Sequence, residues 1–507
     1  MKPLTHPKSG QKAATVCTNH LVLFRALAIL LGLLLIVLLE GLLRLCGVLP
    51  LPFSADPFVS FRDHATLFIP NPAGTHYEIA RERNDFFRPQ FFPVHKSADT
   101  FRIFVLGGST VQGRPYAVET SFTNWLKINL QAAEPDRNFE VINCGGVSYA
   151  SYRLVPILRE TLQYQPDLLI LYTGHNEFLE DRSYARVKNT SAAQLKAQRL
   201  IMDLRIAAVM KRLMPAPSLN AENQTETTVL PADVNALLDF EKGLESYQRD
   251  PIHRQAIMEH FELNLRQMIL MARAARVPLM LVNPVSNLKS CPPFKCEFEN
   301  SLPVEQKARL ISLWKQANDC DWSQAERKMQ LWEAAADIDQ RHAGLLYSIG
   351  KTCEHLKRNE EAKTWFVNAK EEDLCPLRIL EPMHAALIRS ANEFDVPLVD
   401  IRELFEQKTP DGIPGSELLV DHVHPSIEGH QLIADAIYEK LLEMKLFQQA
   451  EDWQATRNQL RQKQLDSLDQ SYFLRGALRS QRLDGWSRGR STQVPVLSTQ
   501  SNANENR

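Results

Sequence analysis

The stretch that decides the fold runs from residue 101 to residue 110 and reads Phe101-Arg-Ile-Phe-Val-Leu106-Gly-Gly-Ser-Thr110. Its first six residues are mostly β-branched or aromatic, which is typical of a buried strand. Two glycines then let the backbone turn sharply, and Ser109 follows that turn. Apolar residues next recur at helical spacing, so the stretch predicts a strand that leads into a helix. These helical positions are Phe122, Trp125, Leu126 and Leu130.

The same alternation continues along the chain. Helical patterns precede the fourth strand and follow the fifth. Strands that alternate with helices favour a parallel sheet with right-handed crossovers, so the expected fold class is α/β. The further strand patterns cover residues 139–142, 167–172, 278–282 and 396–400.

The composition is that of a globular protein, with 44% hydrophobic and 23% charged residues among 507. Lys and Arg number 58 against 60 Asp and Glu, so the net charge is −2. This balance argues against nucleic acid as the main partner, because phosphate binding needs an excess of Lys and Arg. Residues 107–113 contain neither G-x-G-x-x-G nor Gly-Lys-Ser/Thr, so no phosphate-binding loop is expected there.

An apolar stretch at residues 21–43 predicts a transmembrane anchor, with the lipid bilayer as its partner. At about 1.5 Å per residue it can cross a hydrocarbon core about 30 Å thick. No acidic residue precedes Glu40, so the positive-inside rule places residues 1–20 in the cytoplasm and the rest on the periplasmic or extracellular side. A cleaved signal peptide is the alternative, although no A-x-A site follows. The basic residues that precede or open the stretch are Lys2, Lys8, Lys12 and Arg25.

The rest of the chain divides by composition and period. Residues 44–96 predict an irregular lead-in, and residues 449–507 a partly helical and then disordered tail. Between them we expect one α/β domain in two parts, 97–303 and 373–448. A helical insertion at 184–250 lies within the first part.

A second helical insertion, residues 304–372, contains matched pairs 34 positions apart, which is the period of tetratricopeptide repeats. We expect one good repeat and one degenerate repeat, because Lys328 stands where the second copy has Ala362. Such hairpins could receive a protein partner. The matched pairs are Trp332/Phe366, Ala335/Ala369 and Asp339/Asp373.

Four short blocks are expected to meet at the carboxyl edge of the sheet, where open α/β sheets place their sites. A serine nucleophile needs a base, and the base needs a group that orients it. Asp421 precedes His424 by three residues, so one turn can hold the carboxylate against the imidazole. Backbone N–H groups and a side-chain amide could form an oxyanion hole. The candidates for that hole are Ser109, Gly145, Gly146, Ser148 and Asn176.

These blocks resemble the SGNH hydrolase superfamily, the GDSL-like esterases, whose blocks supply Ser, Gly, Asn and His in this order. The resemblance implies a flavodoxin-like, three-layer α/β/α fold and the hydrolysis or transfer of an acyl group. It implies no metal and no organic cofactor. The matching positions are Ser109 in Gly-Gly-Ser-Thr, the loop 143–151, Asn176 in Gly-His-Asn-Glu, and Asp421 with His424.

The chain departs from the family pattern at two positions. Gly108 stands where the family has an Asp, and Ser148 falls on the glycine of the second block. The required donor is a backbone N–H, so Ser148 can serve if its backbone conformation is allowed. An α/β-hydrolase elbow is not expected, because Val111 stands where G-x-S-x-G needs its last glycine.

Other residues near this edge are candidates for lesser roles. His175 could contact substrate, and Arg378 could bind a substrate anion, with a structural salt bridge as its alternative. Cys291 and Cys296 flank a short loop and could form a disulfide. Zinc is not expected there, because no second ligand pair lies nearby.

The expected function is that of a membrane-anchored, extracytoplasmic serine esterase. Ser109 would attack an acyl ester, His424 would act as base, and Asp421 would orient His424. The substrate would be an acylated carbohydrate or another envelope ester, with acetyl as the expected group. One alternative is an O-acetyltransferase that acts on a cell-envelope or secreted polysaccharide. Another is an inactive, repeat-bearing scaffold protein.

Overall fold

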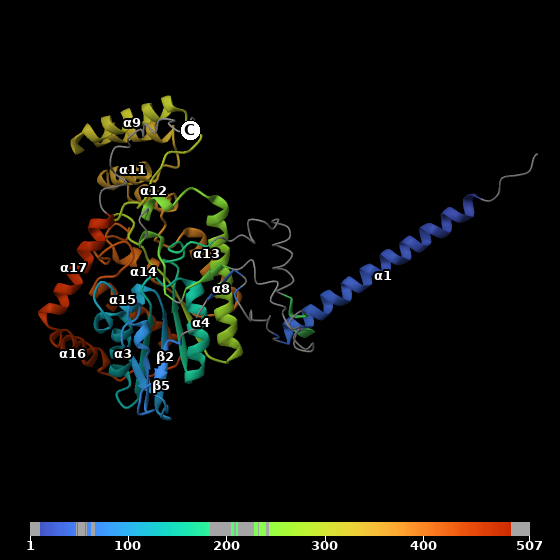
Figure 1. Ribbon diagram of the computed structural model, residues 1–507, viewed down its shortest axis with the longest axis horizontal. Helices are drawn as coiled ribbons and strands as arrows, with labels where there is room; N and C mark the ends of the chain where they lie inside the picture. The colour runs from blue at the N-terminus through green and yellow to red at the C-terminus, as the bar shows by residue number, and fades with distance from the viewer. Residues whose placement is uncertain are drawn as a thin grey trace, which may run out of the picture. The chain divides into compact units, whose positions relative to one another are not determined.

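The computed structural model in Figure 1 separates the chain into two units. The smaller unit is Met1–Ser54 with Asn189–Thr225, and the larger is Ala55–Lys188 with Glu226–Arg507. The residues that the structure describes are 11–46, 48, 56, 58–61, 66–182, 204–206, 209–210, 228–231, 233–239 and 243–487.

The larger unit contains a five-stranded sheet in which every neighbouring pair is parallel. The strand order is β10-β9-β7-β5-β6, which is the 2-1-3-4-5 order of flavodoxin-like sheets. The predicted α/β class and sheet are therefore confirmed. In such sheets ligands bind where the strand order reverses, here beside β5. The strands are β5 (Thr100–Gly107), β6 (Asn138–Gly145), β7 (Leu168–Tyr172), β9 (Leu279–Asn283) and β10 (Leu398–Asp400).

Helices cover both faces of this sheet, which gives the expected three layers (Figure 1). Every residue of β5, β7 and β9 is buried, as parallel strands between two helical layers require. One face carries α3 (Phe122–Ala133) and α15 (Ile427–Glu443). The other face carries α4 (Ser151–Thr161), α8 (Pro251–Ala274) and α13 (Glu381–Glu393).

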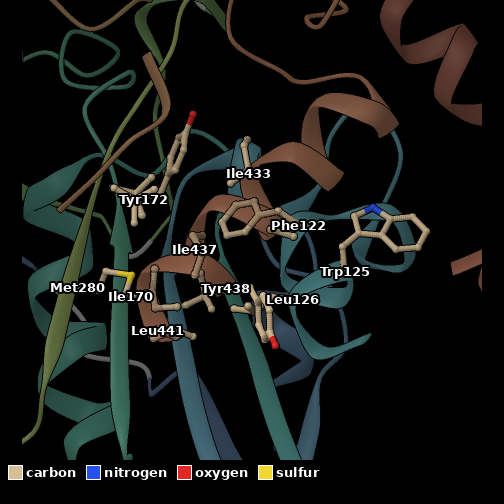
Figure 2. Close-up of a cluster of buried hydrophobic side chains, with 14 of the residues drawn as sticks. Phe122, Trp125, Leu126, Ile170, Tyr172, Met280, Ile433, Ile437, Tyr438 and Leu441 are labelled. Atoms are coloured by element: carbon tan, nitrogen blue, oxygen red, sulfur yellow. The ribbon is translucent and has the colours of Figure 1, made fainter. Parts of the chain in front are cut away.

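The core between α3, α15 and the sheet explains how the helix pattern fixes the layers (Figure 2). Ile433, Ile437 and Leu441 recur every four residues on α15, so they form one buried face. They meet α3 at Phe122 and Leu126, and this layer closes on β7 and β9. Burying one such side chain contributes about 1.5–3 kcal/mol.

The lead-in is not irregular throughout, so that prediction is wrong for residues 68–93. Three strands form an antiparallel sheet there in the order β2-β3-β4. Strands of three or four residues are too short to show alternation in the sequence. A long-range contact helps to place them, because the Glu160 carboxylate of α4 accepts from the backbone N–H groups of Leu67 and Phe68. The strands are β2 (Phe68–Pro70), β3 (His76–Ile79) and β4 (Phe91–Pro93), while β1 (Val59–Phe61) pairs with β8 (Thr228–Leu230).

Residues 304–372 are helical, and consecutive helices pack on one another. Trp332 and Phe366, one of the predicted pairs, are both buried. Lys328 is buried too, and its Nζ donates to Cys320 O at 3.1 Å. The tetratricopeptide-like character and a protein partner stay predictions. The helices are α9 (Val304–Asp319), α10 (Ala325–Ala336), α11 (Ala343–His355) and α12 (Asn359–Glu371).

The smaller unit contains α1 (Gln11–Leu45), whose window Leu27–Leu45 has a mean hydropathy of 2.5. This helix is long and apolar enough to cross a membrane, and a signal sequence would have the same properties. Within the unit, the Glu40 carboxylate accepts hydrogen bonds from the N–H groups of Arg205 and Ile206.

Two further predictions concern segments that are only partly described. Most of the predicted insertion at 184–250 lies outside the described residues. The tail contains α16 (Trp453–Asp466) and α17 (Gln470–Ser487), which form its predicted helical part. We predicted disorder for residues 487–507; Ser487 is the last residue of α17, and residues 488–507 lie outside the described residues.

Candidate active site

Strand β5 delivers Ser109 to the carboxyl edge of the sheet. The strand ends at Gly107, Gly108 is extended, and Ser109 is the first residue of α2 (Ser109–Gln112). A Cβ at Gly107 would lie 2.2 Å from Tyr172 O, and one at Gly108 would lie 2.6 Å from Asn176 Nδ2. The two glycines therefore let Tyr172 and Asn176 lie close to the backbone of residues 107–109, which we call the nucleophile turn.

Ser109, His424 and Asp421 form one hydrogen-bonded chain. Ser109 Oγ lies 2.7 Å from His424 Nε2, and His424 Nδ1 lies 2.6 Å from Asp421 Oδ2. All three residues are buried. Ser109 and His424 are 315 residues apart in the chain, so packing of the sheet and α15 brings them together. This is the arrangement of a hydroxyl nucleophile, a general base and an orienting carboxylate.

Asp421 is held in its charged form. Burial alone would raise its pKa, but His424, His422 and the N–H of Val423 outweigh burial and hold the pKa well below its usual range. Asp421 Oδ1 also accepts from the His424 backbone N–H at 2.8 Å. A charged Asp421 favours the tautomer with hydrogen on Nδ1, which leaves Nε2 to accept the proton of Ser109.

Asn287 fixes the loop that carries these residues and was not predicted. Its side-chain amide donates to Asp421 O at 3.0 Å, and its backbone N–H donates to His422 O at 2.9 Å. Asn287 follows β9 closely and so lies at the same edge as Ser109. That position after a strand is the only signal that sequence contains for it.

The predicted roles of Gly145 and Gly146 as oxyanion donors are wrong. The N–H of Gly145 donates to Asn143 Oδ1 at 2.9 Å, and the N–H of Gly146 donates to Gly107 O at 3.0 Å. Both hydrogens are thus already used within the protein. The lack of a side chain is what matters at Gly145, since a Cβ there would lie 2.2 Å from Gln112 N.

Three donors remain for an oxyanion. In the described part of the chain, the N–H groups of Ser109 and Ser148 donate to no acceptor. The Asn176 amide uses one hydrogen on Tyr149 O at 3.0 Å and keeps the other. Ser148 has φ of 63°, so it adopts the left-handed conformation that suits glycine, at a cost of roughly 1–2 kcal/mol. The departure from the family pattern at Ser148 is therefore accommodated with strain.

Comparison with known proteins now assigns the family. Residues 103–437, more than half of the chain, match the model described as GDSL-like Lipase/Acylhydrolase. This chain belongs to the GDSL-like lipase/acylhydrolase family. Such a hydrolase acts on ester bonds, and the predicted resemblance is confirmed. A search of curated proteins finds no significant match.

Solved structures similar to this GDSL-like hydrolase are remote in sequence. A lipolytic protein of the G-D-S-L family from Desulfitobacterium hafniense is 12% identical, with a TM-score of 0.29, and 67% of this chain and 99% of that one are covered. An acetylxylan esterase from Geobacillus stearothermophilus is 13% identical, with a TM-score of 0.30 and coverages of 67% and 94%. A lipase/acylhydrolase from Enterococcus faecalis is 12% identical, with a TM-score of 0.30 and coverages of 67% and 95%.

Of the two candidate substrate contacts, Arg378 forms the structural salt bridge that was its alternative, and the role of His175 stays a prediction. Arg378 is 2% exposed, its Nη1 donates to the carbonyls of Asn287 and Cys291, and its Nη2 pairs with Asp373 at 3.4 Å. It therefore ties a loop to the α/β domain. His175 accepts from the Ile379 N–H at 3.3 Å, and burial lowers its pKa well below the usual value, with His422 and His424 adding to the shift.

The predicted disulfide is absent, because Cys291 and Cys296 are both free thiols. The Cys296 sulfur accepts from the backbone N–H of Gly344 in α11, whereas the Cys291 thiol donates to Pro292 O at 3.6 Å. The two side chains thus have different partners, and the hydrogen bond to Cys296 links the loop to α11. Burial raises the pKa of Cys296 well above its usual value, so this thiol is poorly reactive.

Proposed function

We propose that this GDSL-like hydrolase is a serine esterase that removes O-acyl groups, in the simplest case acetyl, from a carbohydrate or another ester of the cell envelope. The observation that carries the proposal is the hydrogen-bonded chain from Ser109 through His424 to Asp421. A scaffold protein would not need a buried hydroxyl 2.7 Å from the Nε2 atom of a carboxylate-bound histidine.

In the acylation step, Ser109 Oγ forms a bond to the acyl carbon while its proton passes to His424 Nε2. The carbonyl oxygen becomes an oxyanion that faces the N–H groups of Ser109 and Ser148 and the Asn176 amide. The carbon–oxygen bond to the alcohol then breaks, and His424 returns the proton to the leaving oxygen. Asp421 stabilises the imidazolium throughout.

In the deacylation step, His424 takes a proton from water as the water oxygen attacks the acyl-serine. The bond to Ser109 Oγ breaks, and His424 restores the hydroxyl proton. A carboxylic acid leaves, and the site returns to its starting state. Transfer to a sugar hydroxyl in place of water would make the same site an acetyltransferase.

Helix α1 serves as the anchor in this proposal, with the hydrolase domain on the extracytoplasmic side. Its support is the apolar window Leu27–Leu45 and the basic residues that precede it. Protease treatment of intact cells and of spheroplasts tests the orientation. We expect protease added to spheroplasts to cleave the C-terminal part of the chain. Protection of that part in spheroplasts would contradict an extracytoplasmic hydrolase domain.

Chemical labelling tests the activity directly. The full-length chain in detergent is exposed to a fluorophosphonate probe and to p-nitrophenyl esters of acetate, butyrate and octanoate. We expect labelling and acetate-preferring turnover, both abolished in Ser109→Ala. Ser323→Ala, an exposed serine in the helical segment, is the matched control and should behave as the wild type.

The possible outcomes separate the alternatives. A folded wild-type protein with neither labelling nor turnover would contradict every enzymatic proposal and support the scaffold. Turnover that rises when oligosaccharide is added, with transfer of the acetyl group to it, would replace the esterase by the transferase.

A further inference from the structure

Three arginines from distant parts of the chain gather beside the nucleophile turn. Arg114 follows α2, and its backbone N–H donates to Ser109 O at 3.1 Å. Arg479 of α17 reaches the same segment, since its Nη1 donates to Pro115 O at 3.1 Å and to Tyr116 O at 3.0 Å.

Arg88 lies in the lead-in, just after a segment that is hydrogen-bonded to the loop 143–151 and to α2. Phe86 O, two residues earlier, accepts from the N–H of Val147 at 2.9 Å and from Gln112 Nε2 at 2.7 Å. The charge of Arg88 acts on both Arg114 and Arg479, so the three guanidinium groups are close enough to repel one another.

These three arginines are half-buried, and they lack the acidic partners of several fully buried arginines in the described part of the chain. Among the described residues, Arg88, Arg114 and Arg479 form no ion pair with a carboxylate. The Nε atoms of Arg88 and Arg114 are buried and have no hydrogen-bond partner there. The buried arginines with a carboxylate partner include Arg102 with Glu140 at 2.5 Å, Arg153 with Glu180 at 2.6 Å and Arg378 with Asp373 at 3.4 Å.

The electrostatics of Arg114 reflect this imbalance. Burial, together with Arg88 and Arg479, lowers the pKa of Arg114 to about 10. The one acid that acts in the opposite direction is Asp421, which already binds His424. Apart from this influence of Asp421, no carboxylate among the described residues pairs with the three guanidinium groups, and such a concentration of positive charge attracts anions.

We infer that the ester hydrolysed at Ser109 belongs to an anionic substrate, whose carboxylate or phosphate group is bound by Arg88, Arg114 and Arg479. The inference rests on the proposed function and specifies its substrate class. Guanidinium forks match the paired oxygens of carboxylate and phosphate. An acetylated polymer of uronic acids and a phosphate-bearing glycan both have this chemistry.

Matched substrates test the inference with the full-length enzyme. The ratio of kcat/KM is measured for acetylated oligogalacturonate over neutral acetylated xylo-oligosaccharide, and for an acetylated sugar phosphate over the corresponding neutral sugar. We expect at least one anionic ester to be preferred by about tenfold or more, with a preference that shrinks as salt rises from 0.02 to 0.5 M. The two ratios distinguish carboxylate from phosphate.

Variants locate the preference on the arginines. Arg88→Gln and Arg114→Gln should each lower the ratio about tenfold, mainly through KM, and Arg114→Lys should restore part of it. Arg389→Gln, an exposed arginine of α13, is the control and should leave the ratio unchanged. Equal use of neutral and anionic esters by the wild type, or unchanged ratios in both glutamine variants, would overturn the inference.

A binding measurement separates this inference from the proposed function. Calorimetry with oligogalacturonate and with inorganic phosphate is run on Ser109→Ala, alone and combined with Arg88→Gln. Binding that depends on Arg88, in a protein whose wild type hydrolyses no ester, would support the arginine site and overturn the esterase. Ester hydrolysis with no anion binding would do the reverse.

Discussion

In the described part of the larger unit, His424 and His260 each hydrogen-bond an aspartate, and of these two histidines it is His424 that also contacts a serine hydroxyl. His424 Nδ1 lies 2.6 Å from Asp421, and His260 Nε2 lies 2.8 Å from Asp56. In both pairs burial alone would raise the pKa of the carboxyl, and the histidine with nearby N–H groups lowers it. Judged by the pair alone, the two regions are alike.

The second ring nitrogen is where the pairs differ. His424 Nε2 contacts Ser109 Oγ at the sheet edge. His260 lies on α8, and its Nδ1 is 3.2 Å from Arg182 Nη1. A guanidinium only donates, so it occupies the lone pair with which His260 could accept a proton. The comparison shows that a carboxylate orients a histidine, and that the partner of the other nitrogen decides whether it can act as a base.

Removal of the two imidazoles should separate the pairs most strongly. We expect His424→Ala to lower kcat on the order of 10⁶-fold, because His424 is the one base that contacts Ser109 Oγ among the described residues. His260→Ala should change kcat by less than about threefold and should lower the thermal midpoint, because it leaves Asp56 buried without its partner. Ester hydrolysis and thermal unfolding measure the two effects. A folded, inactive His260→Ala would break the comparison.

Neutralising the two carboxylates should give the next largest difference. Asp421→Asn should lower kcat roughly 10⁴-fold, since the amide stabilises the wrong tautomer of His424. Asp56→Asn should act on stability alone. The readout is kcat at pH 8 on a single acetyl ester. Similar kcat values for Asp421→Asn and the wild type would mean that Asp421 does not orient the base.

The side-chain donor should contribute less than the base. Asn176→Ala removes one of the three remaining oxyanion donors, so we expect kcat to fall about 10²–10³-fold with a small change in KM. Asn124→Ala, whose amide bonds Glu119 O on the exposed side of α3, is the matched control. Equal activity of the two variants would remove Asn176 from the oxyanion hole.

Acid should reduce the stability that each of the two aspartates contributes, because both have lowered pKa values. The pKa values of Asp421 and Asp56 lie below the usual 3.8 in the folded protein. The stability that they contribute is therefore fully present above about pH 4 and is lost as pH falls through the lowered values. The thermal midpoint of the wild type should fall more steeply between pH 4 and 2 than that of Asp421→Asn or Asp56→Asn. Equal slopes in all three proteins would contradict the lowered pKa values.

The smallest effect concerns the strained loop residue. Ser148→Gly should raise stability by about 0.5–1 kcal/mol, because glycine adopts φ of 63° without strain. Activity should stay within about twofold, since the donor is a backbone N–H. Urea unfolding and ester hydrolysis measure both quantities. A large loss of activity would show that the Ser148 hydroxyl takes part in the site.

The sequence predicted the elements whose information is local. The apolar run before Ser109 and the Asp421–His424 spacing are readable in single segments, and both lead to the fold and to the chain of hydrogen bonds. Gly145 was assigned wrongly because its N–H donates to the Asn143 side chain. For Arg378 the sequence left two roles open, and its salt bridge with the buried Asp373 depends on the fold. Arg88 was not recognised, because only the fold brings it close to Arg114.

Helix α17 lies beyond the family match but contacts the segment that follows Ser109. The family match stops at residue 437, yet Tyr472 of α17 bonds Thr120 Oγ1 at 2.8 Å and accepts from the Ala117 N–H at 3.1 Å. A fragment that ends at residue 437 would therefore lack α17 and its hydrogen bonds to Ala117 and Thr120. Through α17, which ends at Ser487, this hydrolase extends 50 residues beyond the end of the family match at residue 437.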